Sequence, residues 1–186
     1  MLELLAPAGN LDAVIAAVQN GADAVYMGFG DGFNARRSAD NFTRESFAKA
    51  VRYCHIRGCK VYVTLNTLVG DREMDAAAAL AQQASDAGAD AILVQDLGLA
   101  RVLRDALPDI PLHASTQMSI HNLAGVEAAA EMGITRAVLS RELSLEQIRF
   151  ISQHASIETE VFVHGALCFC HSGQCYMSAL IGRRSG

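Results

Sequence analysis

A short pattern that recurs three times limits the folds available to this chain. Residues 20–26 (NGADAVY) and 87–93 (AGADAIL) are near copies of each other, and residues 131–138 (EMGITRAV) form a looser third copy. In each copy a glycine ends a helical pattern and a strand-like run begins within a few residues, as at a helix C-cap that leads into a buried strand. The repeat therefore predicts helices that alternate with strands of one sheet.

Seven strand-like apolar runs are spread along the chain. They begin near Leu2, Ala24, Val61, Ala91, Leu112, Ala137 and Glu158. Continuous apolar runs of this kind fit parallel strands that are buried on both faces. Between them, apolar residues recur at helical spacing, as in Leu11, Val14, Ile15 and Val18. Strand–helix alternation through seven units predicts an α/β fold of the (β/α)8 TIM-like barrel type rather than a doubly wound sheet.

The length of the chain bears on how much of such a barrel it contains. A barrel of this type typically takes about 250 residues, whereas this sequence has 186. We therefore expect residues 1–186 to form a single N-terminal barrel domain, incomplete, that stops before the last strand–helix unit. An incomplete barrel exposes its edge strands, so we also expect self-association through those edges.

Charge and hydropathy narrow the partners and the compartment. The net charge of −5 argues against broad coating of nucleic acid, although it leaves room for a local basic groove. No apolar run approaches the roughly 20 residues of a membrane-spanning helix, and residues 1–5 lack the positive region of a signal peptide. We therefore expect a cytoplasmic protein without a membrane partner, in which clustered thiols favour a metal over disulfides.

Polar residues follow several of the expected strands, at the end where barrel enzymes place their catalytic groups. The residues expected to converge on one cleft are Asn66, Gln95, Ser115, Gln117, Arg141 and Glu142. Arg141 is the candidate for a ligand carboxylate, because its planar fork matches that geometry. Glu142 would either orient Arg141 or act as an acid or base. For each single position a cap or turn role stays open, and Asn10 and Ser144 are expected to be caps.

The histidines and lysines separate into candidates and background. His121 and His164 are the histidines best placed for chemistry, and His113 is expected to line the core or the barrel. The two lysines, Lys49 and Lys60, fall in a helical pattern and at the start of a strand, which argues against Schiff-base chemistry. The candidate catalytic set is Arg141, Glu142, His164, Asn66 and Gln117.

A cysteine cluster follows the last strand-like run. Cys168, Cys170 and Cys175 lie within eight residues, just after a His-Gly turn. Thiolates clustered at the end of a strand suit a metal ion or an iron–sulfur cluster. The spacing is not the paired C-x2-C of a zinc ribbon, and by itself it does not identify the metal. The alternative is a set of small buried side chains that bind nothing.

The segment from Glu160 to Ser178 resembles the signature of the collagenase-like peptidase family, whose members are grouped as peptidases of unknown catalytic type. The matching pattern is E-x-F-x2-G-A-L-C-x4-G-x-C-x-M-S. Residues 5–9, 20–26, 64–67 and 140–143 also resemble family blocks, so the resemblance extends over the whole chain. One departure is His171, which stands where the family pattern is expected to have an aromatic residue.

The resemblance implies a barrel enzyme without settling its activity. Relatives include enzymes that hydroxylate a tRNA or ribosomal RNA base, with prephenate as a possible co-substrate, and others that help hydroxylate the ubiquinone ring. Several hold a 4Fe–4S cluster on four cysteines. The first two of those match Cys168 and Cys175, and Cys170 is a third candidate outside the family arrangement. The family pattern continues to two further cysteines past Gly186, so the chain alone is expected to bind the cluster poorly or not at all.

Three functions remain open at this point. The favoured one is an iron–sulfur-dependent enzyme that hydroxylates an RNA base or a similar aromatic ring. The second is a peptidase, as the family label states, although the sequence contains neither H-E-x-x-H nor G-x-S-x-G. The third is a non-catalytic barrel that binds a substrate within a larger assembly. The expected partner is accordingly an RNA or a peptide.

Overall fold

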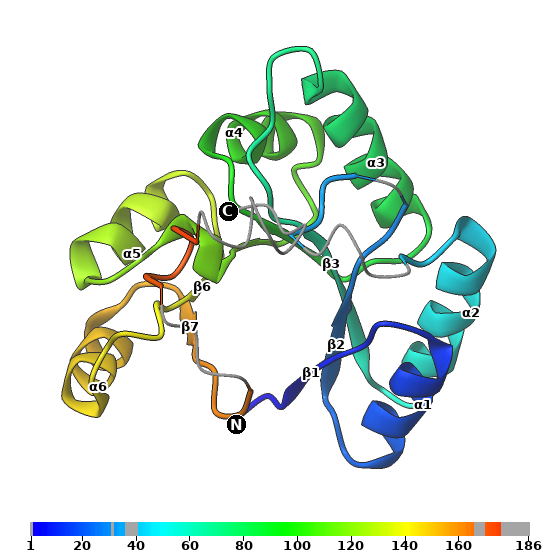
Figure 1. Cartoon of the computed structure of the whole chain (residues 1–186), viewed down its shortest axis with the longest axis horizontal. Coiled ribbons are helices and arrows are strands. Elements are labelled where there is room, and N and C mark those ends of the chain that lie inside the picture. Colours follow the sequence, from blue (N-terminus) through cyan, green and yellow to red (C-terminus); the bar gives the residue numbers. More distant parts are fainter. Residues whose placement is uncertain (1, 31, 36–40, 166–169, 176–186) are drawn as a thin grey trace.

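The computed structural model describes residues 2–30, 32–35, 41–165 and 170–175. Within them, seven parallel strands form one curved sheet and six α-helices lie outside it (Figure 1). The strands are β1 (Leu5–Pro7), β2 (Ala24–Met27), β3 (Lys60–Leu65), β4 (Ala91–Val94), β5 (Leu112–Ala114), β6 (Arg136–Val138) and β7 (Glu158–Glu160). The helices are α1 (Leu11–Gln19), α2 (Arg44–His55), α3 (Met74–Asp86), α4 (Leu97–Ala106), α5 (Leu123–Glu131) and α6 (Leu145–His154), with a 3-10 turn η1 (Thr116–Met118) after β5.

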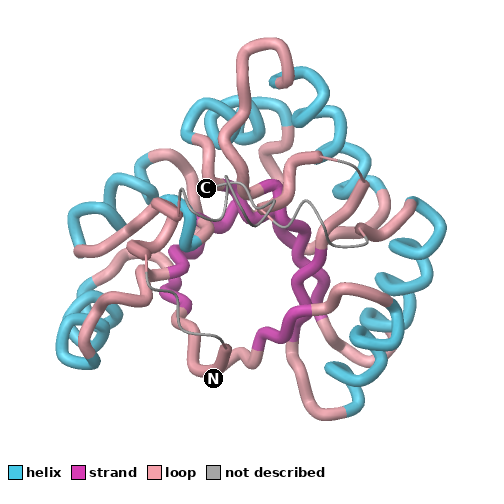
Figure 2. The backbone as a smooth tube through the Cα atoms, viewed as in Figure 1, coloured by secondary structure: helices cyan, strands magenta, loops and turns pink. Residues whose placement is uncertain are grey.

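The sheet confirms the expected barrel class. Each strand pairs in parallel with the next strand along the chain, in the order β1-β2-β3-β4-β5-β6-β7. Figure 2 shows the strands curving into a ring with the helices around its outside. Strands β1 and β7 stand at the two ends of the sheet, so the described part of the chain forms a TIM-like barrel of seven strands. Self-association through these edges stays a prediction.

The first strand differs from its expected position. It begins at Leu5 rather than near Leu2, whose side chain is fully exposed. The residues before it are held by side chains instead of the strand ladder, since the Leu4 N–H donates to Asp23 Oδ2 at 2.8 Å. The other six strands begin within one residue of the positions that the sequence predicts.

The threefold sequence repeat has a direct structural cause. Gly21, Gly88 and Gly133 follow the ends of α1, α3 and α5 with φ of +90°, +97° and +81°, a region that residues with a Cβ rarely adopt. The aspartates of the two closest copies each anchor a neighbouring segment. Asp23 accepts from Leu4 just before β1, and Asp90 Oδ2 accepts from the Val61 N–H in β3 at 2.7 Å. The repeat therefore encodes both the turn into each strand and its tie to the strand beside it.

Side chains alternate between the two faces of the sheet. Outward-facing residues of β3 to β6 pack against α3 to α6, and those of β2 and β3 pack against α1 and α2. Ala24, Tyr62, Ala91 and Leu93 form a smaller separate cluster on the other face, inside the barrel. Because the side-chain period of a strand is two, the inward positions form layers along the barrel axis.

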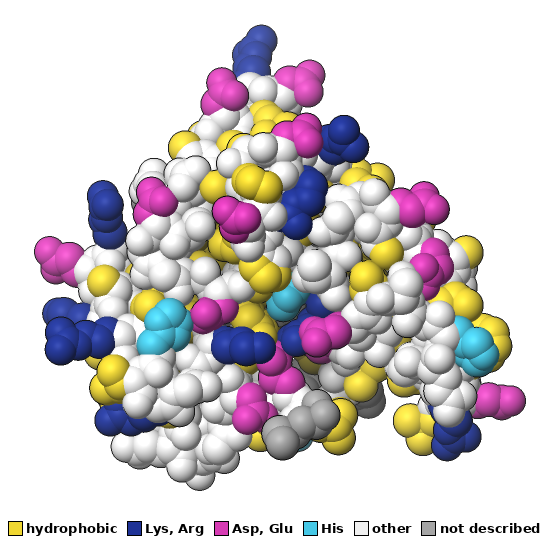
Figure 3. Space-filling model, turned by 180° about the vertical axis from the view of Figure 1, so that it is seen from behind, with side chains coloured by type: hydrophobic (Ala, Val, Ile, Leu, Met, Phe, Trp, Pro, Cys, Tyr) yellow, Lys and Arg dark blue, Asp and Glu magenta, His cyan; other side chains and the backbone are white. Residues whose placement is uncertain are grey.

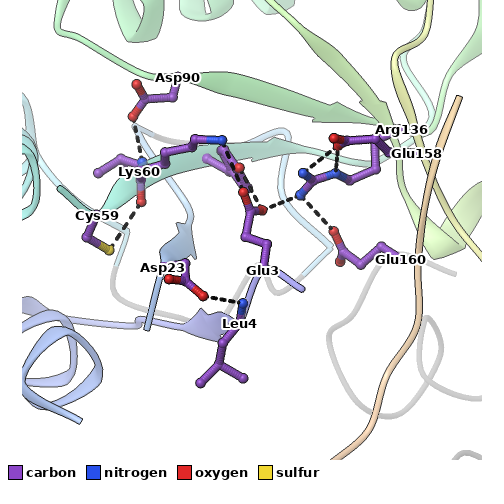
Figure 4. Close-up of polar contacts among 11 residues, drawn as sticks. Glu3, Leu4, Asp23, Cys59, Lys60, Asp90, Arg136, Glu158 and Glu160 are labelled. Carbon is purple, nitrogen blue, oxygen red and sulfur yellow. Dashed lines mark hydrogen bonds and ion pairs between the residues drawn. The ribbon is translucent and has the colours of Figure 1, made fainter. Parts of the chain in front are cut away.

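The inward layer at the amino ends of the strands is a closed network of charges (Figure 4). Arg136 is nearly buried and contacts three carboxylates: Glu3 at 2.5 Å, Glu158 at 2.6 Å and Glu160 at 3.6 Å. Glu3 also accepts from Lys60 Nζ at 3.1 Å and from the Tyr62 hydroxyl at 2.8 Å. Side chains of both charges gather near the middle of the face shown in Figure 3, which is the reverse of the face toward the viewer in Figure 1.

This network changes how its members bind protons. Burial alone would raise the pKa of Glu3, but hydrogen bonds from Arg136, Tyr62 and Lys60 lower it from 4.5 to about 2. His113, which stacks edge-on against Tyr62 with ring centroids 4.9 Å apart, has its pKa lowered to about 3 by burial and then by the charge of Arg136. His113 lines the barrel as expected, with its Nδ1 buried and lacking a hydrogen-bond partner in the described part of the chain.

None of the helices in the described ranges combines the length and apolar character needed to cross a bilayer.

Candidate functional site

A cavity of about 240 Å³ lies at the carboxyl ends of the strands, the opposite end of the barrel from the charge network. Its walls come from the loops after β1, β2, β3, β5, β6 and β7. The lining residues are Pro7, Ala8, Gly9, Tyr26, Met27, Gly28, Asn34, Ala35, Asn41, Thr64, Asn66, Leu93, Ser115, Thr116, Gln117, Val138, Arg141, Glu160, Phe162, His171, Gly173 and Cys175. The cavity therefore combines apolar walls with a few amides, hydroxyls, one guanidinium and one carboxylate, as small-molecule sites do.

The structure brings four of the six expected cleft residues to this cavity: Asn66, Ser115, Gln117 and Arg141. Gln95 and Glu142 are not among its lining residues. The Gln95 side chain is buried, and its Oε1 has no hydrogen-bond partner among the described residues. Glu142 lies beside the cavity and makes contacts of its own. The prediction of one shared cleft is thus confirmed for four of the six residues, while Gln95 and Glu142 lie outside the cavity wall.

Asn66 connects two walls of the cavity. Its Oδ1 accepts from the Ala35 N–H at 3.1 Å, and its Nδ2 donates to Ser115 Oγ at 3.2 Å. Ser115 Oγ also accepts from the Gln117 N–H at 3.3 Å and caps the turn after β5. Both oxygens are therefore committed to holding loops, which fits a positioning role for Asn66 and Ser115. Gln117 also lines the cavity.

Arg141 is an exposed cation at the cavity wall. Its guanidinium carbon lies 5.4 Å from the centroid of the Phe162 ring, within the range of a cation–π contact. Its backbone N–H donates to Ser172 Oγ at 3.2 Å. Among the described residues no carboxylate pairs with it, so Glu142 does not orient Arg141, the first of the two roles considered for Glu142. The guanidinium remains available for an anionic ligand group, since a ring face leaves its planar donors unused.

Glu142 contacts Ser172 and His121 rather than Arg141. Its Oε1 accepts from the Ser172 N–H at 2.6 Å and lies 3.1 Å from Ser172 Oγ, while its Oε2 lies 3.3 Å from His121 Nε2. Burial would raise the pKa of Glu142, but the hydrogen bonds from its own backbone and from Ser172 lower it below the usual value. Glu142 is therefore a carboxylate held at the junction of three loops rather than a partner that orients Arg141.

Glu160 is a cavity residue that the sequence did not single out as catalytic. It ends β7 and faces inward, where it shares Arg136 with the charge network below. Burial raises its pKa, although the nearby Arg136 charge opposes this. Its Oε2 is buried and accepts no hydrogen bond from the described residues. A carboxyl group with a raised pKa in a cavity wall is suited to proton transfer. The sequence feature that could have pointed to Glu160 is its position as the first residue of the family signature.

Residues 170–175, here called the cysteine segment, contribute one wall of the cavity. Cys175 lines it and is half-buried, Cys170 is half-buried without lining it, and Cys168 lies outside the described residues. Gly173 has φ +76°, and a Cβ there would come 2.3 Å from the Gln117 carbonyl oxygen. The glycine of the signature thus lets this segment pack directly on the turn after β5, which places the Cys175 thiol beside the polar groups of the cavity.

His164 does not join the other candidates. It follows β7 in a stretch of exposed residues and is not part of the cavity wall. A catalytic role for His164 therefore has no support from its position. Cys54 in α2 and Cys59 in the turn after it are buried, and burial raises the pKa of Cys54 to about 12. They lie away from the cavity.

Comparison with known proteins identifies the class of this barrel. The model of the family described as "Peptidase family U32" matches residues 9–186. The solved structure titled "The Structure of the U32 Peptidase Mk0906" shares the fold, with a TM-score of 0.72, 17% identity, and coverage of 91% of this chain and 71% of that one. The chain belongs to peptidase family U32, as the signature indicates.

Two curated relatives are closer in sequence. The chain is 44% identical over 177 residues to "23S rRNA 5-hydroxycytidine C2501 synthase" of Escherichia coli (strain K12), covering 95% of this chain and 26% of that protein. It is 40% identical over 176 residues to "tRNA hydroxylation protein P1" of Bacillus subtilis (strain 168), covering 95% of this chain and 42% of that protein. The chain thus spans a quarter to less than half of the length of these relatives.

Proposed function

We propose that this barrel is the substrate-binding and catalytic part of an enzyme that hydroxylates an RNA base. The observation that carries the proposal is the cavity at the carboxyl end, where amides, Arg141 and Glu160 surround an apolar space beside Cys175. Two relatives named for rRNA and tRNA hydroxylation, each at 40% identity or more, support RNA as the substrate class.

The chemistry of the cavity suits a planar polar ring. The Gln117 amide can both donate to and accept from a base edge, and apolar walls at Pro7, Met27 and Leu93 can pack on its faces. Arg141 supplies a cation for a phosphate or for the carboxylate of a co-substrate such as prephenate. Glu160 can take a proton from the reacting centre or return one, since its pKa is raised.

An iron–sulfur cluster is part of the proposal. Thiolates are the ligands that such clusters need, and Cys175 stands in the cavity wall with Cys170 in the same segment. When bound, a 4Fe–4S cluster would supply electron transfer or activation of a co-substrate next to the base. Cys168 and Cys175 are the proposed ligands of this chain, and Cys170 is the alternative third ligand.

The decisive experiment measures the modified nucleoside itself. In a strain that lacks the gene, hydroxylated nucleosides would be counted by mass spectrometry of digested tRNA and rRNA before and after the wild-type gene is restored. We expect one hydroxylated nucleoside to return with wild type and not with Cys175→Ala or Glu160→Gln. Arg101→Ala, which alters an exposed pair on α4, is the control and should restore it fully. Unchanged RNA with wild type would contradict the proposed substrate.

Peptide hydrolysis is the second candidate, because one side-chain array superficially resembles a catalytic triad. Ser140 Oγ lies 3.3 Å from His121 Nδ1, and His121 Nε2 lies 3.3 Å from Glu142. However, the Ser119 carbonyl is only 2.6 Å from Nδ1, so that nitrogen carries a proton and cannot accept one from Ser140. The Ser140 side chain is also buried. Peptidase activity that disappears in Ser140→Ala would reverse this preference.

A further inference from the structure

Three side chains from separate loops meet beside the cavity. They are His121 from the loop after η1, Glu142 from the loop after β6, and His171 from the cysteine segment. One ligand atom of each lies within 4.8 Å of the others. Of these residues only His171 lines the cavity, so the group stands at the cavity edge and outside the set that faces a substrate base.

The hydrogen bonds of His121 fix which nitrogen carries its proton. Nδ1 lies 2.6 Å from the Ser119 carbonyl oxygen, which can only accept, so Nδ1 donates. In the neutral ring, Nε2 then presents a lone pair toward Glu142 Oε2 at 3.3 Å, and two acceptors face each other. A positive charge between the two atoms resolves this conflict, either as a proton on Nε2 or as a metal ion. Metal-binding histidines characteristically donate their other ring N–H to a backbone carbonyl in this way.

Glu142 is oriented in the same manner. Ser172 donates its backbone N–H to Oε1 at 2.6 Å, and its hydroxyl lies 3.1 Å from the same oxygen. Oε1 is therefore committed and Oε2 is the atom presented to the histidines. Ser119 Oγ in turn donates to the Ser172 carbonyl at 2.5 Å, which ties the loop of His121 to the segment of His171. The three ligand loops are thus connected by bonds that do not use the ligand atoms.

We propose that His121, Glu142 and His171 form a binding site for one divalent transition-metal ion, separate from the cysteine ligands. Two imidazole nitrogens and one carboxylate oxygen suit Zn²⁺, Fe²⁺ or Co²⁺ and do not suit Mg²⁺ or Ca²⁺, which prefer oxygen alone. Ligand atoms around a tetrahedral zinc ion lie about 3.3 Å apart, given metal–ligand bonds of about 2.0–2.1 Å. The His121–Glu142 spacing already matches this, and the exposed His171 ring needs to approach by no more than about 1.5 Å.

A bound ion would also hold together the loops that surround the cavity. Three protein ligands leave at least one coordination position open to water or to a substrate oxygen, as in catalytic rather than structural zinc sites. Binding would also fix His171, Gly173 and Cys175 against the loops after β5 and β6. The signal in the sequence is His171 itself, at a position where the family pattern is expected to have an aromatic residue.

The test titrates metal-free protein with Zn²⁺ by calorimetry and with Co²⁺ by visible absorption. We expect one ion to bind with cobalt d–d bands but without the intense near-ultraviolet band of a cobalt–thiolate bond, which would report the cysteines instead. His121→Ala, His171→Ala and Glu142→Gln should each weaken binding by about a hundredfold or more, and Ser172→Ala by up to about tenfold.

Two controls separate the site from general effects. His55 and Asp90 form another His–carboxylate pair at 2.8 Å, outside the three-ligand group found in the described residues, so His55→Ala should leave binding unchanged. Far-ultraviolet circular dichroism checks that each variant is folded. Wild-type protein that binds no ion except through thiolates, or ligand variants that bind like wild type, would overturn the proposal. The readout does not depend on RNA hydroxylation or on the iron–sulfur cluster.

Discussion

The two ends of this barrel use the same inward strand positions in opposite ways. At the amino ends of the strands, Arg136 and Lys60 neutralise carboxylates from β7 and from the segment before β1, so the layer is filled and its charges are compensated. At the carboxyl ends, Arg141 has a ring contact with Phe162 and no carboxylate partner among the described residues, beside a cavity of about 240 Å³. The paired charges at the amino ends fill the barrel there, and we call this layer of Glu3, Lys60, Arg136, Glu158 and Glu160 the plug. The unpaired cation at the carboxyl ends leaves that end able to bind a ligand.

The largest expected effect comes from breaking the plug. Arg136→Ala removes the cation that Glu3, Glu158 and Glu160 share, and it leaves the mostly buried Glu160 without a cation while Glu3 keeps only Lys60. The loss of one partner of a buried charge network typically costs about 3–5 kcal/mol of stability. We expect a loss of that size in urea unfolding at pH 7. The matched control is Arg141→Ala at the other end, which should change stability by no more than about 0.5 kcal/mol. Equal losses at both ends would contradict the comparison.

At the carboxyl ends of the strands we expect the opposite result: a substitution should lower activity and leave stability unchanged. Arg141→Lys keeps the charge but loses the fork that can hold a phosphate or carboxylate with two bonds. On the proposed function, we expect kcat/KM for RNA hydroxylation to fall by about 10–100-fold, with stability unchanged. Lys60→Arg at the amino end is the control and should leave activity intact, because Lys60 pairs with Glu3 away from the cavity. An unchanged kcat/KM in Arg141→Lys would remove Arg141 from the site.

A smaller effect concerns the pH range over which the plug is stable. The unfolded chain protonates His113 near pH 6.5, whereas the folded protein keeps it neutral down to about pH 3. Its contribution is therefore complete above pH 6.5 and is lost as pH falls through that window. Between pH 6.5 and 5, before Glu3 begins to lose its own contribution, we expect wild type to lose about 1.5 kcal/mol more than His113→Gln. Parallel urea-unfolding curves for the two proteins across this interval would show that His113 contributes nothing.

The sequence could predict much of the fold because its signals are local. A glycine after a helix and an apolar run of a few residues determine where each strand starts, and six of seven strands begin where expected. The first strand was placed too early, because residues 2–5 look strand-like in the sequence. In the structure, Asp23 accepts from the Leu4 N–H, and Glu3 pairs with Lys60 and Arg136. That information is spread across distant parts of the chain.

The site could be predicted only where it follows directly from strand ends. Asn66, Ser115, Gln117 and Arg141 reach the cavity because the carboxyl end of a parallel strand has a fixed direction. The partner of Glu142 could not be read in this way, because Ser172 and His121 reach it from other loops. His164 follows β7 in an exposed stretch and is not among the residues that line the cavity, so its catalytic role stays a prediction.

The smallest expected effect on stability is at Glu160, which belongs to both ends of the barrel. Burial raises the pKa of Glu160 even though Arg136 lies 3.6 Å away, so the ionised carboxylate is less favourable in the folded protein than in the unfolded chain. At pH values above its unfolded pKa this group lowers stability. Glu160→Gln should therefore be neutral or stabilising by up to about 1 kcal/mol at pH 7, and its advantage over wild type should shrink as the pH is lowered.

In the same Glu160→Gln variant, RNA hydroxylation should be lost. Urea unfolding at pH 7 and pH 5 checks the first part, and nucleoside analysis checks the second. A clear destabilisation at pH 7 would place Glu160 in the plug alone, whereas stability gained with activity lost is the behaviour of a residue kept for function.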